Sequence, residues 1–325
     1  MRWVWFALLL LGCGTASPLD TAFAEAARNP HLSSLAVQHD GLLVRERYFH
    51  GTGPDTPHDV RSVTKTVTSL LVGIALDRGC LRSVNQTLGE LLAADAPTDP
   101  AKAAITVQSL LSMSSGLQWD ELGSSSAEYN GWALADNQVS YVLARPLVSK
   151  PGAVFSYDSG AFHLLSVILT RACAPTADFA RDHLFAPLGI TRAHQWETDA
   201  QGNASGAAGL NLSTRELLRI GDLILNHGGG VVPAAWVEAA TSVQVDHGPG
   251  LDPATGYGYG LWVVHGPRGD VAFAEGHGGQ FIAVDRRTRV VVAATTEWQD
   301  LGTAAFQDFD DIYALIARRI LPAFD

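Results

Sequence analysis

The sequence predicts an α+β fold: an antiparallel sheet built from N- and C-terminal strands, flanked by helices, with a mainly helical region inserted between them. Apolar and polar residues alternate near both ends of the chain, whereas between about residues 83 and 225 apolar residues recur at helical spacing. Strands at the two ends share a core most simply when they pair in one sheet that helices cover. Hydrophobic residues make up 47% of the 325 residues and charged residues 17%, which is enough for a large core.

Each predicted element has a local signal. Residues 39–41 contain an Asp-Gly pair between two alternating runs, which indicates a β-hairpin. Apolar residues at helical spacing follow Ser62, and the last helix carries an apolar stripe of Phe309, Ile312, Ile316 and Ile320. The clearest predicted helices are residues 19–28, 62–79, 105–112, 217–225 and 306–320. The predicted strands are residues 34–38, 42–49, 259–265, 270–275, 280–285 and 290–296.

Residues 1–17 are expected to be an export signal. Arg2 precedes an apolar run that ends at Leu11, which is far shorter than the roughly 20 residues needed to span a bilayer. Cys13 follows this run in a Leu-Leu-Gly-Cys segment that resembles the lipobox of bacterial lipoproteins, so it is a candidate for lipidation. Ordinary cleavage near residues 14–16 is the alternative. Both place residues 18–325 outside the cytoplasm, either in the periplasm or on a membrane through a lipid anchor.

Charge and cysteine content exclude several classes of partner. The net charge of −11 argues against nucleic acid and against docking on an anionic membrane. The chain has no Cys-x-x-Cys motif and no close cluster of His and Cys, so the sequence implies no metal and no cofactor. The oligomeric state is left open.

The segment from Arg61 to Thr66 contains the most informative motif. Ser62 and Lys65 are three residues apart at the start of a predicted buried helix, so their side chains are expected to lie close together. Burial disfavours the ammonium form of a lysine, and a neutral amine can take the proton of a serine and make it a nucleophile. The chain has only three lysines, which makes a lysine at this position more informative.

Three further segments give this motif a family context. They are residues 105–121, residues 151–160 with Tyr157-Asp158-Ser159, and His277-Gly278-Gly279-Gln280. Together with Ser62-x-x-Lys65, and in this order, they resemble the penicillin-recognising serine hydrolases. That group includes class C β-lactamases, D-alanyl-D-alanine carboxypeptidases, related esterases and nylon-oligomer hydrolases. The likeness extends over nearly the whole of residues 18–325 and implies a β-lactamase/transpeptidase-like fold.

The resemblance implies a role for each motif. Ser62 would be the nucleophile that is acylated, and Lys65 would share its proton. Tyr157 would act as a base only if a nearby cation such as Lys65 favoured its phenolate. The family's oxyanion hole would use the main-chain N–H groups of Ser62 and Gln280. The edge formed by His277, Gly278 and Gly279 would let a substrate lie against a strand.

Two departures from the family pattern bear on the substrate. Ser159 stands where many members have asparagine, and His277 stands where peptidases and β-lactamases have a lysine that holds the substrate carboxylate. A histidine is largely neutral above about pH 6.5, so it holds a carboxylate less well. Both changes favour small esters or amides. Trp119 is a candidate for the acyl pocket, although core packing is the commoner role of such a tryptophan.

Several alternatives remain open at this stage. A D,D-peptidase or class C-like β-lactamase is one, and a catalytically inactive binding lipoprotein is another. Asp120 and Glu121 are expected to be solvated loop charges without a catalytic role. In the family, the Ser62 helix and the helix after Tyr157 both begin at the active site, so Cys80 and Cys173 are expected at similar depths and could form a disulfide.

Overall fold

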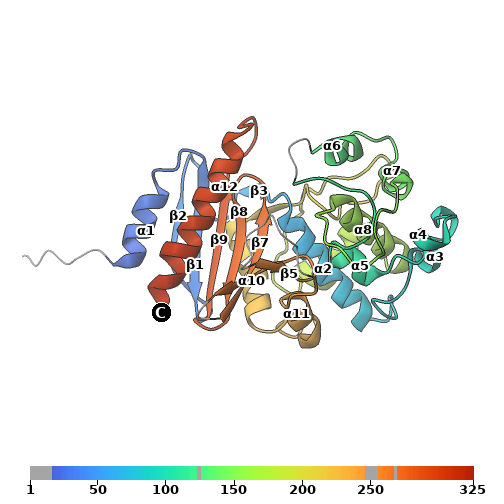
Figure 1. Ribbon diagram of the computed structural model, residues 1–325. Coiled ribbons are helices and arrows are strands. Elements are labelled where there is room, and N and C mark those ends of the chain that lie inside the picture. Colours follow the sequence, from blue (N-terminus) through green and yellow to red (C-terminus); the bar gives the residue numbers. More distant parts are fainter. Residues whose placement is uncertain (1–16, 123–125, 246–254, 267–268) are drawn as a thin grey trace, which may run out of the picture.

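The two ends of the chain meet in one seven-stranded sheet (Figure 1). The computed structural model describes residues 17–122, 126–245, 255–266 and 269–325, so the predicted export signal up to residue 16, with Cys13, lies outside the described residues. The strand order is β2-β1-β9-β8-β7-β6-β5, and every neighbouring pair is antiparallel. The predicted fold class is therefore confirmed. The strands are β1 (Leu32–His39), β2 (Leu42–Tyr48), β5 (Thr255–Tyr257), β6 (Trp262–Gly266), β7 (Gly269–Gly276), β8 (Gln280–Asp285) and β9 (Val290–Thr296).

The strand predicted for residues 259–265 begins later than expected. Residues 258–261 form a turn between β5 and β6, so the regular strand starts at Trp262. Gly260 has a φ of 74°, and a Cβ there would lie 2.8 Å from the main-chain oxygen of Lys65. A glycine is needed because the turn packs directly on the backbone of the next layer.

Helices cover both faces of the sheet. One face packs against α1 (Pro18–Ala26) and α12 (Ala304–Leu315), and the chain continues through η3 (Ile316–Ile320) and η4 (Leu321–Phe324). The predicted stripe of the last helix points into this layer, where Ile312, Ile316 and Ile320 are buried. The other face packs against α2 (Val63–Asp77) and α10 (Thr214–Leu225). The helical region is predicted at about 83–225, but α10, the last helix in this range, packs on the sheet. Hydrophobic periodicity identifies a helix but does not reveal which layer the helix packs against.

The remaining helices form a region on the side of α2 that faces away from the sheet (Figure 1). Its central helix, α8 (Ser159–Ala172), packs along α2. The other elements are α3 (Leu88–Leu91), η1 (Ala93–Asp95), α4 (Pro100–Ala103), α5 (Val107–Leu111), α6 (Ala127–Ala133), α7 (Gln138–Ala144), α9 (Thr176–Ala180) and η2 (Arg181–Phe185), with α11 (Ala234–Ala240) beside α2. A two-stranded sheet of β3 (Pro57–Asp59) and β4 (Asn211–Ser213) links the chain before Ser62 to the chain before α10. Within the described residues, no helix has the length and apolar character needed to cross a bilayer.

The two cysteines lie where α2 and α8 end, as expected from the lengths of the helices. Both are free thiols in the structure and both are partly buried. Burial, together with a hydrogen bond between the side chains of Cys173 and Cys80, raises the pKa of the Cys173 thiol. The side chains are thus in contact without a covalent bond, and the disulfide stays a prediction.

We expect these thiols to join under oxidising conditions, because they are already neighbours. The bridge would close a loop of roughly 90 residues and contribute on the order of 4 kcal/mol in the chain-entropy model. Mass spectrometry after alkylation without reduction measures it. Oxidised protein that carries two alkylated thiols at Cys80 and Cys173 would contradict the prediction.

Candidate active site

Ser62 and Lys65 lie together at the N-terminal end of α2. Ser62 immediately precedes the helix, after Arg61 with a φ of 48°. The Nζ of Lys65 is 2.8 Å from the Oγ of Ser62 and donates to the main-chain oxygen of Ala207 at 3.0 Å. The Lys65 side chain is buried, with only 1% of its surface exposed. The structure therefore brings the two residues into the contact that their spacing predicts.

Burial determines the protonation behaviour of Lys65. Removal from water lowers the pKa of its ammonium group to about 8, and the positive charge of Arg61 adds to this effect. The carboxylates of Glu121 and Asp158 act in the opposite direction. A lysine in this state loses its proton near neutral pH and can then accept one from Ser62.

Tyr157 lies over the same pair. Its ring centroid is 4.9 Å from the Nζ of Lys65, and its hydroxyl is hydrogen-bonded to Ser62. Trp262 stacks on the ring at 5.9 Å with an interplanar angle of 6°, and the edge of Tyr257 contacts it. Burial, followed by the negative charge of Glu121, raises the pKa of Tyr157 well above its usual value. Tyr157 therefore remains a neutral phenol, which makes Lys65 the better proton acceptor.

The residues after Tyr157 form a polar network with Glu121, which was expected to be a solvated loop charge. Asp158 caps α8 by accepting from the N–H of Ala161 at 2.9 Å. The hydroxyl of Ser159 donates to Oε1 of Glu121 at 2.7 Å, and its N–H donates to Oε2 at 3.0 Å. Glu121 is thus not a solvated loop charge. No motif marked it, and only its place two residues after Trp119 in the 105–121 segment could have drawn attention to it.

Trp119 occupies the core rather than a substrate surface. It is 6% exposed and packs edge-on against Trp132 and Tyr141. Its indole N–H donates to Oε2 of Glu121 at 3.0 Å. The acyl-pocket role considered for Trp119 is therefore not supported, and its position explains how Glu121 is held.

The end of β7 lies next to the loop that precedes Ser62. A Cβ on Gly276 would lie 2.5 Å from the main-chain oxygen of Val60, so only glycine permits this approach. His277 follows, and its ring contacts Trp298 and Phe306 edge-on. Burial and the charge of Arg61 lower the pKa of His277, so its imidazole is neutral near pH 7. Arg61 itself pairs with Asp59 and donates to the Tyr129 hydroxyl.

Gln280, whose main-chain N–H is predicted to belong to the oxyanion hole, pairs with Gly276 of β7. Gln280 begins β8, which lies between β7 and β9, and it is fully buried with its amide bonded to Thr296. Gly278 and Gly279 form the turn before it, both with positive φ. The main-chain N–H groups of Ser62 and His277, in contrast, have no acceptor among the described residues. His277 is therefore a further candidate for the second donor, and the assignment of Gln280 stays a prediction.

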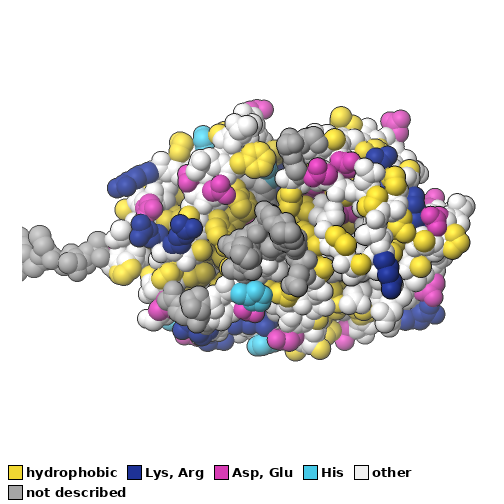
Figure 2. All heavy atoms as spheres, in the orientation of Figure 1, with side chains coloured by type: hydrophobic (Ala, Val, Ile, Leu, Met, Phe, Trp, Pro, Cys, Tyr) yellow, Lys and Arg dark blue, Asp and Glu magenta, His cyan; other side chains and the backbone are white. Residues whose placement is uncertain are grey.

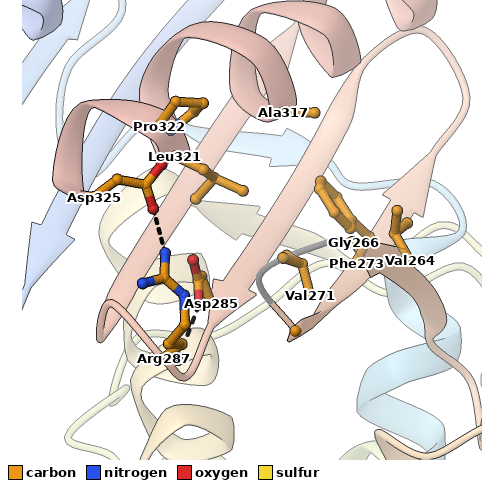
Figure 3. A pocket seen from close by; sticks show the side chains of 11 residues that line it. Val264, Gly266, Val271, Phe273, Asp285, Arg287, Ala317, Leu321, Pro322 and Asp325 are labelled. Carbon is orange, nitrogen blue, oxygen red and sulfur yellow. Dashed lines mark hydrogen bonds and ion pairs between the residues drawn. The ribbon is translucent and has the colours of Figure 1, made fainter.

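A separate hollow of about 150 Å³ lies beside the C-terminal end of the chain (Figure 3). Apolar side chains from β6, β7, η3 and η4 line most of it, and Arg287 pairs with Asp325 at its edge. None of its lining residues belongs to the Ser62 site, so it is not part of the catalytic arrangement.

A nucleophile candidate, a buried lysine and a tyrosine in contact are the arrangement of a serine hydrolase, and comparisons with known proteins agree. The family model described as Beta-lactamase matches residues 33–315, and the chain belongs to this family. A 6-aminohexanoate-dimer hydrolase of Paenarthrobacter ureafaciens is 25% identical over 338 residues, which covers 95% of this chain and 86% of that protein. The chain is therefore a serine hydrolase related to β-lactamases.

Two solved structures share its fold. A candidate 6-aminohexanoate-dimer hydrolase from Bacillus anthracis superposes with a TM-score of 0.73 at 20% identity, covering 94% of this chain and 84% of that one. A D-stereospecific amidohydrolase from Streptomyces superposes with a TM-score of 0.68 at 17% identity, covering 90% and 98%.

We expect kcat/KM to rise with pH through a value near 8. The depressed pKa of Lys65 of about 8 means that the amine is protonated below this pH and free to accept a proton above it. A pH–rate profile with a neutral ester measures this. A rising limb near pH 10.5, the ordinary range of lysine, would show that Lys65 is not desolvated as described.

Proposed function

We propose that this chain hydrolyses small neutral esters or amides through an acyl-enzyme on Ser62. The observation that carries the proposal is the 2.8 Å contact between the Oγ of Ser62 and a buried lysine nitrogen whose pKa is lowered. Without such a partner a serine hydroxyl is a weak nucleophile near neutral pH.

The acylation step follows from the positions of three side chains. The Oγ of Ser62 bonds to the substrate carbonyl carbon while its proton passes to the Nζ of Lys65. The bond to the alcohol or amine then breaks, and the leaving group takes a proton from the Tyr157 hydroxyl, which regains one from Lys65. Water repeats the sequence in reverse and releases the acid. The N–H of Ser62 and a second N–H from the segment of His277 and Gln280 stabilise the developing oxyanion, a contribution of about 3 kcal/mol per donor.

The preference for neutral substrates rests on the groups around Ser62. His277 is neutral, and Arg61 is already paired with Asp59, so neither is a free cation for a substrate carboxylate. Ser159 is bonded to Glu121 and is not turned toward a substrate amide. On the face shown in Figure 2, Lys and Arg side chains lie toward the two ends, and the visible middle carries hydrophobic and acidic side chains. The 6-aminohexanoate-dimer hydrolase relative is consistent with a small amide substrate.

Export of the chain is part of the proposal and rests on residues 1–17 alone. Cell fractionation of the wild-type chain and of Cys13→Ala, with radiolabelled palmitate, separates a lipid anchor from plain cleavage. Retention of the full-length chain in the cytoplasm would rule out both.

Ser62→Ala should abolish hydrolysis, because the bond-forming oxygen is lost. Lys65→Ala and Tyr157→Phe should each lower kcat/KM at least ~10²-fold, the usual scale for losing general acid–base help. Steady-state assays with 4-nitrophenyl butyrate, together with fluorophosphonate labelling, test this. Ser69→Ala is a matched control, since this buried serine lies on the same helix and its hydroxyl has no partner among the described residues. A fully active Tyr157→Phe variant would remove the tyrosine from the mechanism.

Substrate preference should favour esters over β-lactams. We expect a higher kcat/KM for 4-nitrophenyl butyrate than for nitrocefin or a D-Ala-D-Ala peptide, because neither His277 nor Arg61 is a free cation for their carboxylates. Side-by-side assays of the three substrates measure the preference. A higher value for nitrocefin would instead indicate a β-lactamase, and a higher value for the peptide a D,D-peptidase.

A further inference from the structure

Glu121 is bonded to the catalytic segment by three donors. Its Oε1 accepts from the hydroxyl of Ser159 at 2.7 Å. Its Oε2 accepts from the N–H of Ser159 and from the indole N–H of Trp119, both at 3.0 Å. Trp119 is held in the core of the helical region, and Ser159 begins α8 two residues after Tyr157. The carboxylate therefore joins the loop after α5 to the segment that carries the tyrosine.

We propose that Glu121 is a positioning residue of the catalytic site, which fixes Ser159 next to Tyr157 and sets the pH range of hydrolysis through its negative charge on Lys65 and Tyr157. This inference rests on the proposed function of Ser62. It assigns to Glu121 two effects that can be separated: a geometric one through its three hydrogen bonds and an electrostatic one through its charge.

The electrostatic effect has a definite sign. A carboxylate near an ammonium stabilises the charged form, and a carboxylate near a phenol disfavours the phenolate. Glu121 accordingly raises the pKa of both Lys65 and Tyr157. Because Lys65 accepts the proton of Ser62, the charge of Glu121 moves the rising limb of the rate profile to higher pH.

Other ionisable groups face the same two residues and remain unchanged in a Glu121 variant. Arg61 lowers the pKa of Lys65, and Asp158 raises it. Glu275 and Tyr129 raise the pKa of Tyr157. The ionisable groups around the pair are Arg61, Asp158, Tyr129, Tyr257 and Glu275.

Glutamine can replace Glu121 without loss of the contacts. Its amide oxygen can take the place of Oε2 and accept from Ser159 and Trp119. Its NH₂ group can donate to the Ser159 hydroxyl, which rotates from donor to acceptor. Aspartate is the complementary change, because it keeps the charge but is one methylene too short to make all three bonds.

The test is the pH dependence of kcat/KM for 4-nitrophenyl butyrate in the wild type, Glu121→Gln and Glu121→Asp. We expect the rising limb of Glu121→Gln to move to lower pH by roughly one unit. Glu121→Asp should keep the limb at the wild-type pH while kcat/KM falls on the order of tenfold, because buried donors lose their acceptor. Asp310→Asn removes the same charge from an exposed position on α12 and should leave the profile unchanged.

Distinct outcomes overturn the two proposals. The charge of Glu121 would have no role in the pH dependence if the Glu121→Gln variant unfolded near the wild-type temperature and the rising limb of its kcat/KM profile stayed at the wild-type pH. If Glu121→Gln does not fold, a limb that moves to lower pH in Glu121→Asp would contradict the inference, because the charge is still present. A wild-type chain that hydrolyses none of the esters, amides or β-lactams would overturn the proposed function instead.

Discussion

The burial of one lysine amine is the constraint on which the catalytic site depends. Lys65 lies on α2, the helix between the sheet and the helical region, and its Nζ contacts Ser62, Ala207 and the ring of Tyr157. The turn at Gly260 packs against the main-chain oxygen of the same lysine. An amine taken out of water in this way loses its proton more easily, which converts an ordinary lysine into a base. Close packing around Lys65 is thus a chemical requirement as well as a source of stability.

Glycines at a few positions make this close packing feasible. Gly260 and Gly276 let two segments of the C-terminal strands approach the backbone at Lys65 and Val60. A Cβ at either position would clash with that backbone, so each close approach requires glycine. Glu121 contributes in another way, because it links the Tyr157 segment to the buried Trp119. The catalytic groups are therefore positioned by residues that need not touch a substrate.

Much of this arrangement could be predicted from the sequence because the relevant signals are local. The hairpin at Asp40 and Gly41 has positive φ at both residues, as an Asp-Gly pair indicates, and the spacing of Ser62 and Lys65 predicted their contact. The errors concern long-range geometry. Glu121 has no motif, and its partner Ser159 is 38 residues away. His277 and Gly279 precede a strand, and sequence alone does not reveal that they form the turn between β7 and β8.

The pairing of the chain ends determines when the sheet can be completed. β1 pairs with β9, so Leu32 on the second strand of the sheet lies opposite Thr296 on the third. Contacts between residues so distant in sequence form late, because a long loop must close before they add to stability. A chain that is still being synthesised lacks β9 and leaves one side of β1 unpaired. The edge of β1 is therefore covered only once β9 has been made.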